Sequence, residues 1–205
     1  MDRQTLINQL STLPKSTLID CIMTSQKVNK DPTNIVSSQD RLYFYSKSAD
    51  RFPGKGANEF VSNPSDYTEL ARIKDFRKVL SNFHYCPFVF EGKTYNTIEH
   101  VFQAKKTALV DPVRASYFTR ESGHPIGQGD GLTAQKNRKL VILDKGSIAK
   151  WAQISDKVME QAAIAKYRQC PEAMNVLKLT GKAQLWHIVA RKQPVRFKHL
   201  ERIRS

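Results

Sequence analysis

Residues 81–107 constrain the fold most, because this short stretch combines a turn, a hairpin and a helix. The hairpin is expected from two strand-forming segments and the turn between them, namely residues 88–90, 94–95 and 91–92. Asn96 or Thr97 then provides an N-terminal cap for a helix that begins near Ile98. The sequence therefore predicts a hairpin that leads directly into a helix of the core.

That helix carries a polar stripe along the edge of its apolar face. At about 100° per residue, the apolar arc consists of Ile98, Val101, Phe102 and Leu109, and the stripe of Glu99, Gln103 and Lys106. A stripe that borders the core lies at the rim of a cleft, where burial shifts the pKa of a carboxylate and a nearby ammonium group restrains it. The alternative is a solvated helix face, the commoner reason for a glutamate and a lysine seven positions apart. Lys105 falls inside the apolar arc, which requires its ammonium group to reach outward to water.

The order and spacing of several short motifs in this region resemble the signature of the NADAR family, also called YbiA-like. These motifs are Ser81-Asn82-Phe83, Pro87-Phe88, Gly92-Lys93, Ile98-Glu99-His100, Phe102-Gln103-Ala104 and Lys106. The resemblance implies an enzyme that hydrolyses N-glycosidic bonds on ribose, with Glu99 as the central catalytic group. It also implies substrate binding by the turn and the helix, through Ser81, Asn82, Phe83, Phe102 and Gln103.

Length and composition are those of an ordinary globular protein with one main core. The chain has 205 residues, 40% hydrophobic and 25% charged, so one domain with an extension is the default expectation. We expect a compact α+β domain of the NADAR type over residues 41–205, predominantly α-helical with a few short strands. Residues 1–40 are expected to form an extension of two short amphipathic helices and a polar linker. The extension lies outside the resemblance, and it either packs on the domain or binds a partner.

The charge balance is strongly basic. Lys and Arg number 33 against 19 Asp and Glu, which gives a net charge of +14. Such a surface attracts polyanions, that is, nucleic acid or a phosphate-rich ligand, although it also serves solubility alone. Because no RRM, KH, zinc-finger or basic-zipper signature accompanies the charge, a dedicated reader of nucleotide sequence is not expected.

Cysteine and histidine usage argues against a disulfide framework and against a metal site. Cys21, Cys86 and Cys170 are far apart and form no Cys-x-x-Cys pair, and the histidines form no His-Glu-x-x-His pattern. We therefore expect a reducing compartment, no metal and no cofactor. The sequence contains no secretory hydrophobic region and no apolar run of about 18 residues. An intracellular, soluble protein, cytoplasmic or nuclear and without a membrane partner, is the resulting expectation.

A second stretch of resemblance lies at the start of the domain. Residues 42–45 are expected to form a strand. The segment FYSKSADRFPGKG, which begins within this strand at Phe44, resembles the opening of the longer NADAR variants of eukaryotes and large DNA viruses. In those variants a basic loop contributes to the ligand cleft. The resemblance makes Lys47 and Lys55 candidates for phosphate contact, and Lys47 also for direct chemistry, although such lysines are usually solvated. A helical region is then expected from Pro64 through Leu80.

Glycines are concentrated after the central helix. Asp111-Pro112 is expected to open a helix that runs to about Arg120, and the sequence GHPIGQGDG then leads into a helix over residues 132–140. Glycine-rich loops at a helix N-terminus bind phosphates through exposed backbone N–H groups. The segment resembles the same loop of the longer NADAR variants, which makes Gly127, Gly129 and Asp130 candidates for ligand binding. A plain connector is the alternative, and without a preceding strand the glycines do not indicate a Rossmann fold.

The remaining chain is expected to contain helices around Trp151, from Pro171 to Thr180-Gly181 and over residues 198–204, with a strand over residues 184–189. Trp151 is most simply a core residue. The last segment resembles the longer NADAR variants and departs from the bacterial branch, which leaves the choice of substrate open. Trp186 could stack on a nucleobase or belong to the core, and Arg191 or Arg196 could hold phosphate.

The expected chemistry centres on one carboxylate. Breaking a ribose N-glycosidic bond builds positive charge at the anomeric carbon, and a nearby carboxylate stabilises that charge and activates water. We expect Glu99 to do both, with Asp130 as a possible second carboxylate. Lys106 or Lys47 would protonate the leaving base, orient Glu99 or attack a ring-opened ribose as a Schiff-base former.

Several functions remain open at this point. Members of the family that the chain resembles either remove ADP-ribose from guanine bases or cleave intermediates of riboflavin synthesis. The basic surface ranks an ADP-ribose-containing substrate first, namely DNA, RNA or a nucleoside with modified guanine. The alternatives without catalysis are a module that binds ADP-ribose or nucleic acid and a protein that coats DNA, which would bind plain DNA with steep salt dependence. The oligomeric state is not predicted.

Overall fold

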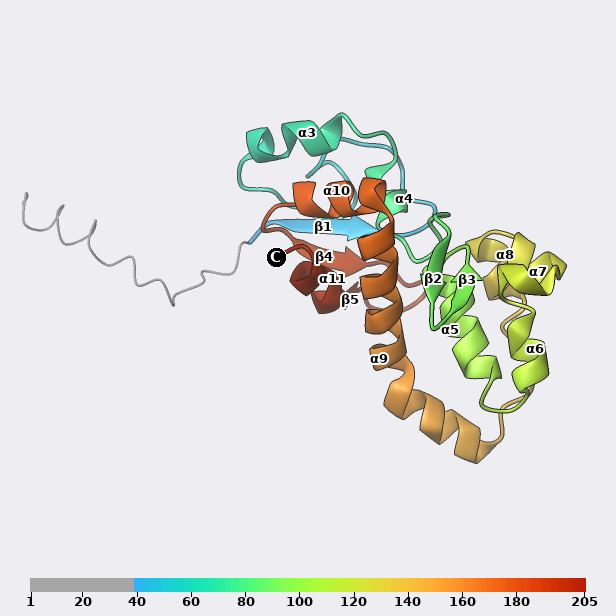
Figure 1. The fold of residues 1–205 in the computed structure, drawn as a ribbon. Helices are drawn as coiled ribbons and strands as arrows, with labels where there is room; N and C mark the ends of the chain where they lie inside the picture. The colour runs from blue at the N-terminus through green and yellow to red at the C-terminus, as the bar shows by residue number, and fades with distance from the viewer. Residues whose placement is uncertain (1–38) are drawn as a thin grey trace, which may run out of the picture. The chain divides into compact units, whose positions relative to one another are not determined.

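The structure is a computed structural model that describes residues 39–205 (Figure 1). The two helices and most of the linker expected in residues 1–40 lie outside the described residues. The described architecture is α+β and predominantly helical, which confirms the expected fold class. Its strands form two small sheets of three and two strands.

The three-stranded sheet joins the beginning of the described chain to its end. Its order is β1-β4-β5, in which β1 and β4 are parallel and β4 and β5 antiparallel. The strands are β1 (Arg41–Phe44), β4 (Gln184–His187) and β5 (Val195–Arg196). Leu42, Phe44 and Leu185 are completely buried, because alternate residues of a strand point to the same face. The strand expected over residues 184–189 is therefore present but ends at His187.

The expected hairpin is confirmed. It consists of β2 (Phe88–Phe90) and β3 (Lys93–Tyr95), which pair antiparallel. Glu91 and Gly92 connect them with φ angles of 49° and 75°. Two consecutive positive φ angles belong to the tight turn whose twist matches that of the flanking strands.

Helices make up most of the rest. They are η1 (Pro64–Tyr67), α3 (Thr68–Ala71), α4 (Phe76–Val79), α5 (Ile98–Thr107), α6 (Pro112–Ser116), η2 (Arg120–Ser122), α7 (Pro125–Gln128), α8 (Gly131–Lys136), α9 (Lys145–Gln169), α10 (Pro171–Leu179) and α11 (Lys198–Ile203). The helical region expected from Pro64 to Leu80 is present as η1, α3 and α4, but it is interrupted before Asp75, whose φ of 58° is left-handed. The helices expected to reach Arg120 and residue 140 end earlier, at Ser116 and Lys136.

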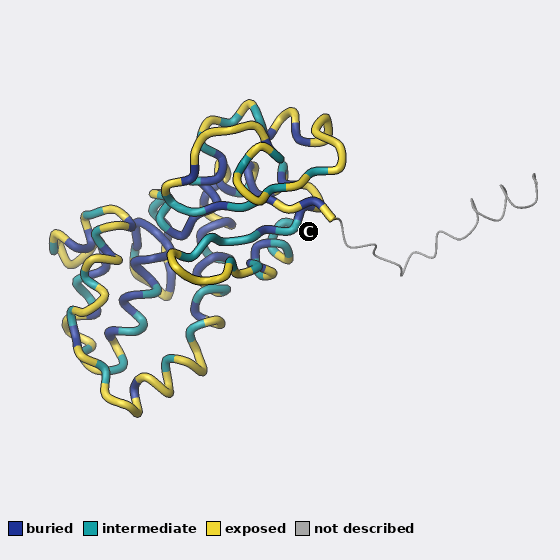
Figure 2. The backbone as a smooth tube through the Cα atoms, turned by 180° about the vertical axis from the view of Figure 1, so that it is seen from behind, coloured by how far each residue is buried: buried dark blue, intermediate teal, exposed yellow. Residues whose placement is uncertain are grey.

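The long helix α9 has two different halves. Apart from Ser147, its buried residues lie in the second half, at Val158, Ala162, Ala163, Lys166 and Tyr167, and the exposed first half is visible in Figure 2. Trp151 in the first half is partly buried, and its ring meets that of Phe102 edge-on with centroids 4.7 Å apart. Within residues 39–205 no helix is both long and apolar enough to cross a bilayer.

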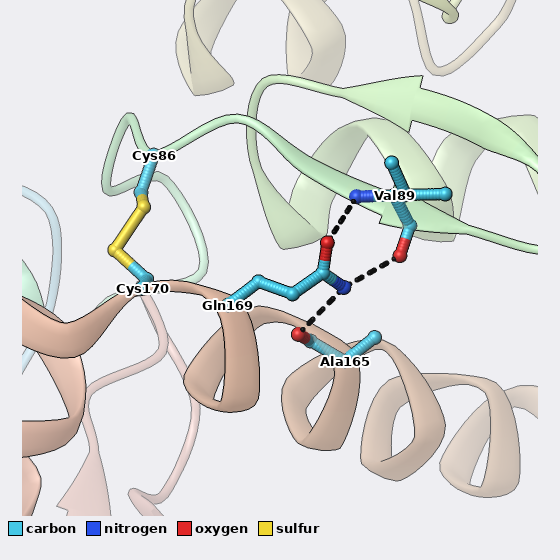
Figure 3. The surroundings of a disulfide bond; sticks show 5 residues. All are labelled: Cys86, Val89, Ala165, Gln169 and Cys170. Carbon is cyan, nitrogen blue, oxygen red and sulfur yellow. Dashed lines mark hydrogen bonds between the residues drawn. A yellow bond between two sulfur atoms is a disulfide. The ribbon is translucent and has the colours of Figure 1, made fainter.

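A disulfide between Cys86 and Cys170 fastens the hairpin to the end of α9, so the expectation of no disulfide is wrong (Figure 3). Their Cα atoms are 6.4 Å apart although the residues are 84 positions apart in sequence. The neighbouring Gln169 accepts a hydrogen bond from the Val89 N–H (2.9 Å) and donates one to the Val89 carbonyl (2.8 Å). This docking of β2 on α9 brings the two cysteines together, and sequence spacing gives no sign of it.

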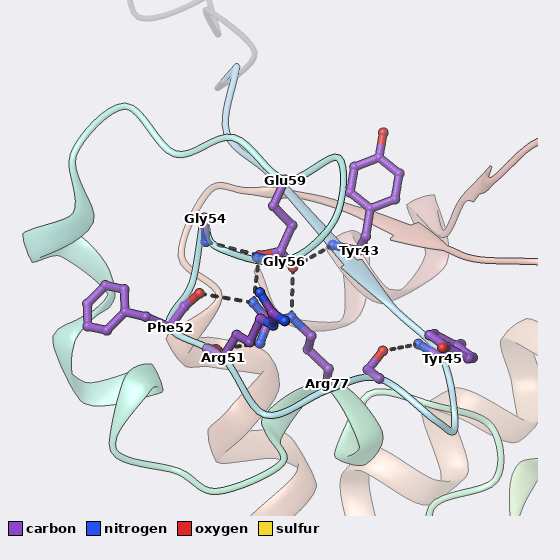
Figure 4. A network of polar contacts seen from close by, with 9 residues as sticks. Tyr43, Tyr45, Arg51, Phe52, Gly54, Gly56, Glu59 and Arg77 are labelled. Carbon is purple, nitrogen blue, oxygen red and sulfur yellow. Dashed lines mark hydrogen bonds and ion pairs between the residues drawn. The ribbon is translucent and has the colours of Figure 1, made fainter.

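A buried ion pair organises the segment after β1 (Figure 4). Glu59 and Arg77 lie 2.6 Å apart with side chains that are 0% and 4% exposed. The Glu59 carboxylate also accepts hydrogen bonds from three backbone N–H groups, those of Tyr43, Gly54 and Gly56. Arg77 donates in addition to the carbonyls of Arg51 and Phe52. The network therefore ties β1, the loop after it and α4 together.

Candidate active site

The expected cap of α5 is present and is part of a buried polar chain. The Thr97 hydroxyl accepts from the His100 N–H and contacts His100 Nδ1 at 2.8 Å. His100 Nε2 lies 3.0 Å from the carbonyl of Ile126, so Nε2 carries the hydrogen and Nδ1 accepts from Thr97. Burial lowers the pKa of His100, although its bond to the Ile126 carbonyl and the charge of Asp130 oppose this. This chain links the start of α5 to α7.

The turn at residues 81–84 holds the backbone of Glu99, which lies two positions after the cap residue Thr97. The carbonyl of Asn82 accepts the Glu99 N–H at 3.1 Å, and the Asn82 side chain donates to the sulfur of Met159 on α9. The Ser81 hydroxyl accepts from the Phe83 N–H at 3.2 Å. Ser81 and Asn82 are thus buried parts of the scaffold behind Glu99, and their contact with a substrate remains a prediction.

Glu99 is a buried carboxylate with little compensation. Its exposed fraction is 8%, and burial raises the pKa of its carboxyl group. A hydrogen bond from the Gln103 amide (2.7 Å) and the positive charges of Lys106 and Arg138 oppose that increase. The buried carbonyl oxygen of Gln103 has no hydrogen-bond partner within residues 39–205. The polar stripe expected on α5 therefore places the buried carboxylate of Glu99 beside Gln103, whose carbonyl oxygen has no hydrogen-bond partner within residues 39–205.

Lys106 is the lysine that the structure brings into electrostatic contact with Glu99. Partial burial lowers the pKa of Lys106, Glu99 raises it and Arg138 lowers it further. Its ammonium group donates to the carbonyl of Arg138 at 2.8 Å. Lys105, by contrast, points away and pairs with Glu91. Lys106 thus acts electrostatically on Glu99, whereas Lys105 is held in an ion pair with Glu91, and the catalytic roles of the stripe remain predictions.

A cleft of about 580 Å³ adjoins this stripe. Lys106 forms part of its wall, together with Arg138, Lys139 and the apolar residues of the connection from α8 to α9. Trp151 lines the cleft and contacts Phe102, which follows Glu99 by three positions on α5. The volume lies in the range of small-molecule sites, about 300–1,000 Å³.

The glycine segment is built differently from a phosphate loop. The Asn96 side chain donates to the carbonyls of Gly127 (3.0 Å) and Gly129 (2.8 Å). Asp130 caps α8 by accepting from the N–H and the hydroxyl of Thr133, both at 2.8 Å, and these bonds lower its pKa. A phosphate at the N-terminus of α8 would therefore compete with the Asp130 carboxylate. The same bonds make Asp130 a helix cap, which weakens its case as a second catalytic carboxylate.

The candidate residues near the C-terminus lie on or after the three-stranded sheet. Trp186 on β4 stacks on Tyr43 of β1, with centroids 6.1 Å apart. Arg196 forms two hydrogen bonds with Glu201, at 2.9 and 2.8 Å, so its guanidinium is already paired. Arg191 is exposed and has a φ of 60°. None of these positions supplies a charge that acts on Glu99.

Lys47 is exposed in the loop after β1. A second cavity of about 350 Å³ lies in this region, and its lining includes Tyr43, Tyr45, Lys55 and Arg77. Lys55 therefore faces a cavity, as expected of a ligand-binding loop, whereas Lys47 does not line it. The predicted roles of both lysines remain predictions.

Arg138 is the residue that sequence reasoning did not assign to the site. Its charge acts on both Glu99 and Lys106, and its carbonyl accepts from Lys106. The only signal in the sequence is its place in the basic segment after the glycines. Within residues 39–205, no three His, Cys, Asp or Glu side chains are grouped as a metal site would require.

Fold and site together define a basic α+β protein with a buried glutamate on a central helix. The charges that act on this glutamate come from Lys106 and Arg138, which line a neighbouring cleft. A family model described as "NADAR domain" matches residues 67–192, more than half of the chain. The chain therefore belongs to the NADAR family, which confirms the resemblance seen in the sequence.

Named relatives include N-glycosidase YbiA of Escherichia coli (strain K12) and of Shigella boydii serotype 4 (strain Sb227). Each is 28% identical over 126 residues, which cover 62% of this chain and 66% of the relative. The chain thus spans just under two thirds of the length of these relatives. The NMR structure of the E. coli protein YbiA has a TM-score of 0.49 and 22% identity, and the similarity covers 83% of this chain and 88% of that one.

Proposed function

We propose that this protein is an N-glycosidase that removes ADP-ribose from ADP-ribosylated guanine in nucleic acid or nucleosides. The observation that carries the proposal is Glu99, a buried and weakly compensated carboxylate in a chain of the NADAR family. Lys106 and Arg138, whose charges act on Glu99, line a cleft. Relatives named N-glycosidase support the reaction type. The net charge of +14 supports a polyanionic substrate.

The reaction requires one carboxylate close to the anomeric carbon. As the bond from this carbon to the guanine nitrogen breaks, its electron pair leaves with the base and positive charge develops on the ribose. Glu99 stabilises that charge and takes a proton from the attacking water, whose oxygen forms the new bond to the anomeric carbon. A raised pKa suits this role, because it brings the proton affinity of the carboxylate closer to the working pH.

The departing guanine needs a proton or a hydrogen-bond donor. Lys106 is the candidate for this role, because it is half-buried, its pKa is lowered and its charge acts on Glu99. The route in which a lysine attacks a ring-opened ribose also assigns the task to Lys106 before Lys47, since Lys106 lies in the electrostatic neighbourhood of Glu99. The unpaired carbonyl of Gln103 is available to a hydroxyl group of the ribose.

The test is release of ADP-ribose from ADP-ribosylated guanosine, free and within DNA, by the wild-type protein and by Glu99→Gln. We expect release by the wild type and a loss of at least about 100-fold in the variant. Glu69→Gln is the matched control, because Glu69 is an exposed carboxylate on α3 (63%).

Other outcomes would contradict parts of the proposal. Full hydrolysis by Glu99→Gln would refute the assignment of Glu99. Faster cleavage of riboflavin-pathway intermediates than of modified guanosine would refute the choice of substrate. Tight binding of ADP-ribose without release by the wild type would refute catalysis and indicate a binding module.

A further inference from the structure

The cleft beside Lys106 has an unusually apolar and exposed floor. It is formed by residues 141–143 together with Ile148 and Trp151. Ile142 is 90% exposed and Ile148 56% exposed. Single exposed apolar side chains are ordinary, but apolar residues that line one cleft indicate a surface with a binding partner.

The same stretch of chain is strongly cationic. Residues 136–150 contain one carboxylate, that of Asp144, which accepts the Ser147 N–H at 2.7 Å as the cap of α9. Against it stand five exposed basic residues, Lys136, Arg138, Lys139, Lys145 and Lys150. A partner of this cleft should therefore combine apolar groups with several negative charges.

We propose that this cleft binds a single strand of nucleic acid, with bases on its apolar floor and phosphates along residues 136–150. The inference rests on the proposed function and names its substrate as modified guanine within a strand. Single-stranded binding sites combine an aromatic or apolar platform for bases with a cationic path for the backbone. The site is joined to the reaction centre, because Lys106 lines the cleft and its charge acts on Glu99.

Burial of Glu99 favours a single strand over a duplex. A carboxylate that is 8% exposed cannot approach the bond between ADP-ribose and a guanine that is held in a base-paired duplex, so the guanine must leave the stack or be presented unpaired. An anionic membrane surface is the competing partner, because exposed apolar residues beside basic ones also bind lipid. The experiment therefore includes vesicles as an arm.

The decisive experiment is binding of a fluorescein-labelled oligothymidylate of about 20 nucleotides, measured by anisotropy over a range of salt concentrations. Removing two phosphate contacts with Lys139→Gln/Lys145→Gln should reduce the slope of log K against log salt by about 1.4, at about 0.7 per contact. The matched control is Lys178→Gln/Lys182→Gln, which removes two exposed lysines at the end of α10 and after it. We expect the control to keep the wild-type slope.

The floor is tested separately. Trp151→Leu and Ile142→Ser should each weaken binding about fivefold or more, since base stacking is lost with the platform. Val113→Ser is the control for an exposed apolar residue elsewhere, because Val113 is 69% exposed on α6.

Three results would overturn the inference. The first is oligonucleotide binding that the Lys139/Lys145 variant retains in full. The second is binding to vesicles of anionic phospholipid that requires Ile142 while the oligonucleotide is ignored. Because the probe contains no ADP-ribose, these results are independent of hydrolysis. Release of ADP-ribose from guanosine by a protein that ignores the oligonucleotide would refute the strand site and leave the proposed function intact.

Discussion

Two buried glutamates in this protein differ in how fully their negative charge is compensated. Glu59 has a completely buried side chain and receives a guanidinium pair from Arg77 and three backbone N–H bonds. Glu99 is nearly as buried but receives one hydrogen bond, from the neutral amide of Gln103, and the charges of Lys106 and Arg138 act on it through space. A fully compensated carboxylate stabilises structure, whereas a weakly compensated one retains the capacity to react.

Burial alone does not distinguish a structural carboxylate from a reactive one, but the hydrogen bonds around it do. The Glu59 network uses its acceptors internally and fixes the loop that leads from β1 towards α4. Around Glu99, by contrast, a buried acceptor on Gln103 has no partner within the described residues, and a cleft lies next to the stripe. The cost of leaving polar groups unsatisfied is tolerated at sites where a ligand completes the bonds.

The largest effect is expected from Arg77→Met. This change leaves the Glu59 carboxylate buried without its partner, which should lower the free energy of unfolding by about 3–5 kcal/mol. Urea denaturation at pH 7 measures the loss. Arg72→Met is the control, because the Arg72–Glu69 pair is 71% and 63% exposed and should contribute at most about 1 kcal/mol. Equal losses in both variants would contradict the structural role of Glu59.

A smaller effect is expected from the disulfide. It holds the hairpin ahead of Glu99 against α9, so its reduction should cost about 2–4 kcal/mol, measured by urea denaturation with and without reductant. The Cys86→Ser/Cys170→Ser variant is the control and should not respond to reductant. Because the chain has three cysteines and two are paired, thiol titration of the denatured, unreduced protein should find one thiol. Three reactive thiols would contradict the bond.

The smallest effect is a shift in pH dependence. In the proposed reaction Glu99 acts as the carboxylate, so activity should rise with pH through its raised pKa. Lys106 lowers that pKa, and Lys106→Met should therefore move the acidic limb of kcat/KM to higher pH. Lys105→Met should leave the limb in place, because Lys105 pairs with Glu91 and is not among the charges that act on Glu99. If the acidic limb of kcat/KM stays fixed or moves to lower pH in Lys106→Met, the claim that Lys106 lowers the pKa of Glu99 is wrong.

Local signals in the sequence predicted the core of the site. The Glu91-Gly92 turn, the Thr97 cap and the polar stripe of α5 depend on neighbours within a few positions, and all three are present. The proximity of Lys106 to Glu99 follows from helical spacing. Sequence patterns of this kind are reliable because they need no knowledge of the tertiary fold.

The features that sequence reasoning missed all depend on distant contacts. The left-handed Asp75 that breaks the expected helix donates its N–H to Asp50, 25 positions away. The Cys86–Cys170 bond and the Glu59–Arg77 pair join residues 84 and 18 positions apart. Arg138 reaches the site only because the segment after α8 docks on Lys106. No local pattern encodes these contacts.

The most direct test compares Glu99→Gln with Glu59→Gln in two measurements, the free energy of unfolding at pH 7 and the release of ADP-ribose per folded molecule. A raised pKa means that ionised Glu99 opposes folding above that pKa, so Glu99→Gln should keep or gain stability while activity falls at least about 100-fold. Glu59→Gln should lose several kcal/mol, about 3–5, and retain activity in the folded fraction. A Glu99→Gln variant that loses stability and keeps its activity would contradict the account.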